Sequence, residues 1–240
     1  MSELETPVSG WNKRKVDAFA EGFLEFLTKV KIDSKDKGGG YCLADGLYDA
    51  QNYFLSQVFD GLAVDIHDFK ILKSRQLGMS TICRALGVFW WGMFDGVQAA
   101  VIYDTASHTA GARLEIEGMI QNLPKGFAFP RIRQSNRDGL LLENGSRAQF
   151  MSAGVRQQRS AGVLGRSSGL NFIMGSEMCS WENDEGITSL KSSVSDMFPN
   201  RLYLWESTAR GPNAWKEMWD EAKLDDLNQR TIFLDRKSVV

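Results

Sequence analysis

The stretch "KILKSRQLGMST" (Lys70 to Thr81) decides the fold, because it joins an apolar segment to a helix-forming segment through a short polar loop. It is similar to the phosphate-loop pattern G-x-x-x-x-G-K-[ST], in which backbone N–H groups and a lysine surround a phosphate. If Gly78 is the second glycine of that pattern, Ser80 falls in its expected place. Met79 then replaces the lysine, and Lys73 replaces the first glycine. The stretch is therefore a working variant, a broken phosphate site, or an ordinary turn between a strand and a helix.

The composition is that of a globular protein, since 43% of the 240 residues are hydrophobic and 24% are charged. The longest apolar stretch, Ala85 to Phe94, is shorter than the ~20 residues that span a bilayer, so we expect a buried helix and no membrane partner. The N-terminus has no signal-peptide pattern. Three cysteines without C-x-x-C spacing and two histidines argue against a zinc site or disulfide framework and favour a reducing cytoplasm.

The net charge of −2 gives no overall signature of nucleic-acid binding, but arginines are concentrated in one part of the chain. Between residues 131 and 166, Asp138 and Glu143 are the only acidic residues. This basic strip consists of Arg131, Arg133, Arg137, Arg147, Arg156, Arg159 and Arg166. It either faces phosphates or forms a solvated surface with ordinary salt bridges, and both alternatives stay open.

The N-terminal part of the chain is predicted to be a small helical segment. Residues 12–30 have apolar side chains at spacings of three and four, which is typical of an amphipathic helix. Residues 31–40 carry charges and three glycines, which indicates a loop or hinge, and residues 43–62 favour a second helix. We therefore expect a helical, lid-like segment over residues 1–62 and a separate core over residues 63–240.

The core is predicted to be an α/β fold, because from about His67 short apolar runs alternate with longer helical patterns. Such alternation is typical of a mainly parallel central sheet flanked by helices. The expected strands are residues 69–72, 98–104, 169–175 and 201–206, with a hairpin over residues 139–153. Several of these strands end in polar residues, where a parallel sheet has its active edge.

A phosphate loop needs inward-pointing backbone N–H groups, a glycine, a hydroxyl that binds magnesium and a cation for the phosphates. Gly78, Ser80 and Thr81, at the start of a predicted helix, supply all of these except the cation. Lys73 and Arg75 are the nearest residues that can provide it, since a cation at the start of the loop can fold back over the same phosphates.

The strand in "LNFIMGSEMCSW" ends in Ser176 and Glu177, where a Walker B element has its acidic pair. The glutamate of such a pair polarises the attacking water, and the residue before it, usually aspartate, holds the magnesium shell. The neutral Ser176 departs from this pattern, so either Glu177 shares both duties or metal affinity is lower. The alternative is that Glu177 merely caps the end of a strand and has no catalytic role.

A third strand end follows in "LYLWESTARGPNAWKEMW", where Ser207 and Thr208 precede Gly211. A hydroxyl at this place can sense the γ-phosphate of a bound nucleotide. A phosphate loop, an acid and a hydroxyl at three strand ends in this order arise by chance much less often than any one of these features alone.

As an ordered set, these motifs resemble the ATPase part of the large terminase subunit, the DNA-packaging motor of tailed bacteriophages. The resemblance is carried by "KSRQLGMST", "GSEMCSW" and "STARGPNAW", and it covers roughly residues 43–232. It implies an ASCE-type, RecA-like P-loop ATPase fold that binds ATP and Mg²⁺. The implied phosphate loop consists of Lys73, Ser74, Arg75, Gln76, Gly78, Met79, Ser80 and Thr81.

The resemblance also implies roles for residues at the strand ends. Ser80 would bind magnesium together with Ser176 and Glu177, and Glu177 would activate water. Thr208 would couple hydrolysis to movement. The departures Met79 and Ser176 are either compensating changes or marks of a weakened enzyme, and we favour compensation because Lys73 offers a replacement cation.

Two further roles come from the same resemblance. Gln51 falls where such ATPases have a glutamine that recognises adenine, and Tyr48 would pack on the ring; the alternative is a polar residue on an amphipathic helix. Arg166 lies where an arginine finger would reach the nucleotide of a neighbouring subunit, with Arg156 and Arg159 as competing candidates and a contact to DNA phosphate as the competing role.

The implied function is ATP hydrolysis that drives double-stranded DNA into a procapsid in the host cell cytoplasm. The implied partners are the DNA backbone, the portal protein, the small terminase subunit and further copies of the chain in a ring. The chain stops where the family's nuclease domain would begin, so we expect a motor fragment without nuclease activity. Another P-loop translocase or helicase, and a non-catalytic DNA- or protein-binding module, remain as alternatives.

Overall fold

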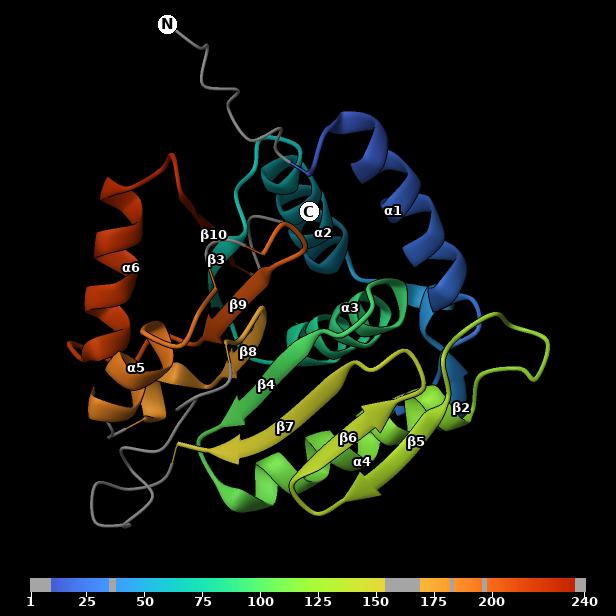
Figure 1. Cartoon of the computed structure of the whole chain (residues 1–240). Coiled ribbons are helices and arrows are strands. Elements are labelled where there is room, and N and C mark those ends of the chain that lie inside the picture. The colour runs from blue at the N-terminus through green and yellow to red at the C-terminus, as the bar shows by residue number, and fades with distance from the viewer. Residues whose placement is uncertain (1–9, 35–37, 154–168, 182–183, 196–197, 236–240) are drawn as a thin grey trace, which may run out of the picture.

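The computed structural model describes residues 10–34, 38–153, 169–181, 184–195 and 198–235. Its centre is an eight-stranded sheet in the order β10-β3-β9-β8-β4-β7-β6-β5, flanked by helices (Figure 1). The strands of this sheet are β3 (Asp68–Lys73), β4 (Gln98–Tyr103), β5 (Ile132–Asn136), β6 (Gly139–Leu142), β7 (Arg147–Ser152), β8 (Phe172–Ser176), β9 (Leu202–Ser207) and β10 (Gln229–Leu234). The α-helices are α1 (Lys13–Leu27), α2 (Asp49–Leu62), α3 (Met79–Met93), α4 (Ala106–Gln121), α5 (Asp184–Lys191) and α6 (Ala214–Leu224).

Most of the sheet is parallel. Strands β10, β3, β9, β8, β4 and β7 run in one direction, while β6 and β5 pair antiparallel at one edge. The expected mainly parallel sheet flanked by helices is confirmed. Because β9 lies between β3 and β8, the carboxyl ends of these three strands are neighbours. The loop after β3 therefore meets the residues that follow β8 and β9.

The two faces of the sheet have separate apolar cores, because side chains alternate along each strand. On β4, Ala99 and Val101 pack in the core shared with α1, α2, α3 and α4, whereas Ala100 and Ile102 pack in the core shared with α5 and α6. The buried helix expected between residues 85 and 94 is the main part of α3. No helix in the described parts of the chain is long and apolar enough to cross a membrane.

The N-terminal segment packs directly on α3. Trp11 stacks on Trp90 with ring centroids 5.1 Å apart, and Phe19 and Phe23 contact the ring of Phe89. This aromatic contact fixes α1 against the helix that leaves the phosphate-loop segment. A division of the chain between residues 62 and 63 stays a prediction.

Residues 31–40 differ from the loop that the sequence predicts. They contribute to an antiparallel pair formed by β1 (Lys31–Ser34) and β2 (Gly38–Cys42), in which Ile32 lies opposite Tyr41. The loop prediction was wrong because this cross-strand pairing and a hydrogen bond from the Gly40 N–H to the Asp33 carboxylate outweigh the local charge and glycine content. The helix expected from residue 43 begins only at residue 49, after a 3₁₀ turn, η1 (Leu43–Gly46).

Candidate functional site

The loop between β3 and α3 depends on a glycine at its end. Gly78 is the N-cap of α3 and has φ +64°, in the left-handed region that favours glycine. A Cβ atom at this position would lie 2.7 Å from Nε2 of Gln51, which is too close for a non-bonded contact. Gln76 also has a positive φ, of 65°. The loop is therefore tightly curled, and its last residue has room only for hydrogen beside α2.

The amide of Gln51 links α2 to this loop. Its Nε2 donates to the Gly78 carbonyl at 2.9 Å, and its Oε1 accepts from the Tyr48 N–H at 3.0 Å. Gln51 is buried, whereas Tyr48 is exposed. The two residues proposed to contact adenine thus lie beside the loop that ends at Gly78, and both ends of the Gln51 amide bond to backbone. Their role toward adenine stays a prediction.

The Met79 side chain lies in the apolar core with 1% of its surface exposed. It provides no charge to the loop, so any cation for the phosphates has to come from another residue. Ser74, which opens the loop, donates its N–H to the Leu234 carbonyl at 2.9 Å and so ties the loop to β10. Arg75 and Gln76 are exposed on the loop, and Thr81 lies in the first turn of α3.

The Lys73 ammonium lies between two carboxylates at the end of β3. Its Nζ is 3.2 Å from Oε1 of Glu177 and 3.6 Å from Oε2 of Glu206. Burial acts to lower the pKa of Lys73, but the Glu206 carboxylate and then the Glu177 carboxylate outweigh burial and raise it above its ordinary value. Lys73 is therefore a charged group held at the edge where the three strand ends meet.

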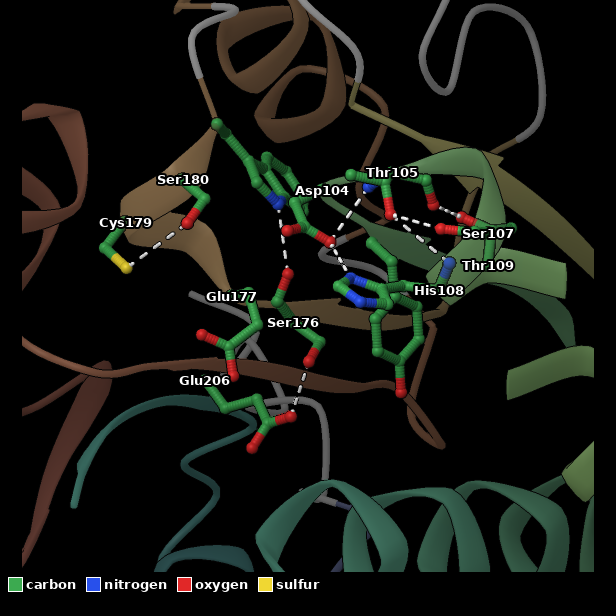
Figure 2. Close-up of polar contacts among 12 residues, drawn as sticks. Asp104, Thr105, Ser107, His108, Thr109, Ser176, Glu177, Cys179, Ser180 and Glu206 are labelled. Atoms are coloured by element: carbon green, nitrogen blue, oxygen red, sulfur yellow. Dashed lines mark hydrogen bonds and ion pairs between the residues drawn. The ribbon is translucent and has the colours of Figure 1, made fainter. Parts of the chain in front are cut away.

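Glu206 is the site residue that sequence reasoning missed. It is completely buried in β9, and its Oε1 accepts a hydrogen bond from the Ser80 hydroxyl. The same oxygen accepts from the Ser176 hydroxyl at 2.6 Å (Figure 2). Its Oε2 has no hydrogen-bond partner among the described residues. The sequence contained a sign of this, because Glu206 stands near the carboxyl end of the apolar strand "LYLWES". A charged residue at such a buried position is unusual unless it has a functional partner.

Glu177 lies at a sharp turn after β8. Its φ of 55° is in the left-handed region, and it is the N-cap of a short 3₁₀ helix, η2 (Met178–Ser180). The Trp181 indole N–H donates to the Ser176 carbonyl at 3.0 Å, which closes this turn. One third of the Glu177 side chain is exposed, at 33%. The turn thus presents a carboxylate to solvent and to Lys73 at the same time.

The end of β9 is hydrogen-bonded to the turn that carries Glu177. The Ser207 hydroxyl accepts from the Cys179 N–H at 2.8 Å, and the Thr208 hydroxyl lies 3.6 Å from the Cys179 sulfur. Asn213 donates to the Cys179 carbonyl at 3.1 Å. A displacement of the segment that contains Thr208 would therefore move the residues next to Glu177.

The basic strip is only partly within the described residues. Arg131, Arg133, Arg137 and Arg147 are exposed on and around the antiparallel edge formed by β5, β6 and β7. Arg156, Arg159 and Arg166 lie outside the described residues, so the arginine-finger prediction stays a prediction.

Comparison with known proteins identifies the fold. No family model and no curated protein sequence matches the chain. The large terminase of a thermophilic bacteriophage, in complex with ADP, is similar in structure with a TM-score of 0.59 and 15% identity, covering 77% of this chain and 44% of that one. The complex of the same terminase with ATP-γ-S has a TM-score of 0.59 and 14% identity, covering 81% and 46%.

The large terminase ATPase domain of Thermus phage P74-26 is also similar, with a TM-score of 0.53 and 16% identity, covering 72% of this chain and 78% of that one. The chain spans less than half the length of the terminase that was solved with ADP and ATP-γ-S. At these identities the likeness shows the fold. The chain therefore has the RecA-like ASCE fold of phage large terminase ATPase domains, which confirms the fold that the sequence motifs implied.

Proposed function

We propose that this chain is a Mg²⁺-dependent ATPase motor domain that drives double-stranded DNA into a viral procapsid. One observation carries the proposal: the phosphate-loop segment, a buried lysine, a magnesium-binding type of hydroxyl and two carboxylates converge on one edge of a parallel sheet. The fold relatives named large terminases, one of them with ADP and ATP-γ-S, support the same conclusion.

The phosphates of ATP would lie against the loop between β3 and α3. The N-terminus of α3 directs the backbone N–H groups of its first turn and the positive end of the helix dipole toward this loop. Lys73 starts the loop and carries a charge, while Met79 cannot contribute one because its side chain is buried. Lys73 and the exposed Arg75 are therefore the proposed phosphate cations.

Hydrolysis would proceed by in-line attack of water on the γ-phosphate. Glu177 is the proposed base, because its carboxylate is partly exposed and stands at the carboxyl end of β8. The Ser80 and Ser176 hydroxyls share Glu206 as their acceptor, and the Glu177 carboxylate shares Lys73 with Glu206. These hydroxyls and the Glu177 carboxylate fit a magnesium site built from oxygen ligands. When bound, Mg²⁺ would neutralise charge that develops on the phosphate oxygens.

Coupling to movement would pass through Thr208. Its contact with Cys179, and the hydrogen bond between Cys179 and Ser207, join the end of β9 to the turn that carries Glu177. A change in the γ-phosphate region can thus alter the position of the segment after β9. This physical connection supports the role that the "STARG" motif suggests.

The proposed assembly is a homo-oligomeric ring on the procapsid in the host cytoplasm, with the portal protein and the small terminase subunit as partners. Arg166 would enter the active site of a neighbouring subunit, where an arginine stabilises charge on the transferred phosphoryl group. Contacts to DNA would be to backbone phosphates, since a packaging motor works on any sequence. The exposed arginines of the β5 to β7 edge are the candidate surface.

The test is ATP hydrolysis by the assembled chain with Mg²⁺ and with EDTA. We expect turnover only with Mg²⁺, and we expect mixed assemblies of Arg166→Ala and Glu177→Gln chains to regain activity that neither variant has alone. Lack of rescue in assemblies shown to contain both chains would contradict the trans arginine. An assembly that binds DNA without hydrolysing ATP would instead be the non-catalytic module, and hydrolysis without DNA entry into procapsids would favour another P-loop translocase.

A further inference from the structure

We infer that Glu206 supplies the negative charge of the magnesium site that Ser176 lacks, so that the metal-holding carboxylate lies on β9 and not on β8. This inference rests on the proposed function, because it assigns one more residue to the same nucleotide site. Ser176, which has the usual position of the aspartate, would then act by orienting Glu206.

The register of the sheet places Glu206 beside the usual position. Strands β8 and β9 are parallel, and Ser176 is the direct partner of Glu206 in their pairing. Partnered residues of adjacent parallel strands project from the same face of a sheet. A carboxylate at residue 206 can therefore reach the space that an aspartate at residue 176 would occupy.

The hydrogen bonds of Glu206 connect it to the residue proposed to bind the metal. A carboxylate only accepts hydrogen bonds, so the hydroxyls of Ser80 and Ser176 both donate to Oε1. The Ser80 oxygen keeps its lone pairs while its proton is held by Glu206. This arrangement orients Ser80 toward a cation and places a full negative charge next to it.

The other oxygen of Glu206 is paired only loosely within the described part of the chain. Oε2 is buried without a hydrogen-bond partner among the described residues, and Lys73 is 3.6 Å away. A buried carboxylate normally has its oxygens satisfied, because water cannot replace the missing partner. The orphan oxygen thus marks a place where a cation, or a water bound to one, would satisfy the site.

Charge balance supports the same conclusion. Glu177 and Glu206 both lie next to the Lys73 ammonium. If Lys73 turns to the phosphates when ATP binds, both carboxylates lose this cation, while Glu206 still accepts a hydrogen bond from the Ser80 hydroxyl. A divalent cation would then restore the balance, whereas an aspartate at residue 176 would add a third anion within hydrogen-bond distance of Glu206. The neutral serine at residue 176 therefore avoids a third carboxylate beside Glu206.

The test measures binding of Mn²⁺, as a spectroscopic substitute for Mg²⁺, to the complex of the full chain with ATP-γ-S by electron paramagnetic resonance. We expect Glu206→Gln to weaken Mn²⁺ binding roughly 10- to 100-fold, the range seen when a group that supports a metal ligand is lost. Binding of ATP-γ-S in EDTA should be kept. The double variant Glu206→Gln with Ser176→Asp, which returns the charge to β8, should recover much of the lost affinity. The matched control is Glu217→Gln, an exposed glutamate of α6.

Unchanged Mn²⁺ affinity in folded Glu206→Gln would overturn the inference and leave Glu206 as a partner of Lys73 only. If Glu206→Gln does not fold, Glu206→Asp carries the test, because it keeps the charge but withdraws it from Ser80, and equal Mn²⁺ affinity in that variant would equally overturn the inference. If the unaltered chain binds no ATP-γ-S, the proposed function fails together with the inference. If the unaltered chain binds ATP-γ-S and Mn²⁺ and the substitutions at residue 206 leave the Mn²⁺ affinity unchanged, the inference fails but the proposed function stands.

Discussion

Strands β8 and β9 end side by side but distribute charge and hydroxyls in opposite ways. β8 ends in the neutral Ser176, followed by the partly exposed Glu177 on a left-handed turn. β9 carries the fully buried Glu206, followed by the hydroxyl residues Ser207 and Thr208. Ser176 and Glu206 are partners in the pairing of these strands and share a hydrogen bond, so under our inference the acid missing from β8 is supplied by β9.

The largest expected effect comes from Glu177, the partly exposed carboxylate that follows β8. Glu177→Gln should lower ATP turnover by at least about 100-fold, because a positioned general base typically contributes roughly 100- to 10,000-fold. Binding of ATP should remain, since the amide keeps the size of the side chain. Steady-state hydrolysis and fluorescent-nucleotide binding, measured on the same preparation, check both parts. Normal turnover would remove Glu177 from the role of base.

The next effect concerns the lysine that lies between the two carboxylates. Lys73→Ala should weaken ATP binding by about tenfold or more, since one charge-assisted contact to phosphate is worth roughly 1.5–3 kcal/mol. The matched control is Met79→Leu, a volume-conserving change in a side chain that is 1% exposed. It should leave affinity nearly unchanged. Isothermal titration calorimetry with ATP ranks the affinities of the two variants. A larger loss in Met79→Leu than in Lys73→Ala would contradict the proposal that Lys73 replaces the usual lysine of the loop.

A smaller effect should come from the loop glycine. Gly78→Ala should lower the free energy of unfolding by about 1–3 kcal/mol, because alanine resists a positive φ and its Cβ would meet Gln51. Gly96→Ala is the matched control, since Gly96 has nearly the same φ of +68° and open space around it. Chemical denaturation of both variants separates the backbone cost from the contact with Gln51. Equal losses would show that the contact contributes nothing.

The smallest expected effect is that of pH on ATP binding, which we expect to be nearly absent. Because Glu206 and Glu177 raise the pKa of Lys73 above its ordinary value of 10.5, the ammonium stays charged throughout the range from about pH 7.5 to 9.5. Binding of ATP in EDTA should therefore change less than about twofold over this range. A loss of affinity as the pH rises would mean that burial outweighs the two carboxylates and that Lys73 loses its proton within the range.

The sequence was informative where local pattern and burial agree. The strand before the loop, helix α3 and the order of the strand-end motifs follow from apolar periodicity, and the structure contains them. The pair β1 and β2 was missed because its stabilising partners lie across the hairpin and not within either strand. Strand pairing is a tertiary property that local composition describes poorly.

For the candidate site, as for the fold, the sequence indicated local patterns but not contacts between distant segments. Residues that belong to a known local pattern, such as Gly78 and Ser80, are found at the loop and at the start of the helix. Glu206 was missed because its meaning depends on which strand lies between β3 and β8, which the order of motifs along the chain does not specify. Its contacts with Ser80 and Ser176, 126 and 30 residues away along the chain, exist only in the fold.

The most direct test of the central claim is a crystal structure of the chain with ATP-γ-S and Mg²⁺. We predict that the Lys73 ammonium leaves the two carboxylates and lies within hydrogen-bond distance of the γ-phosphate. We further predict that Glu206 faces the metal through Ser80 or a bound water. Phosphates bound away from the loop, or a γ-phosphate whose only cationic contacts come from other residues while Lys73 stays between Glu177 and Glu206, would contradict this claim.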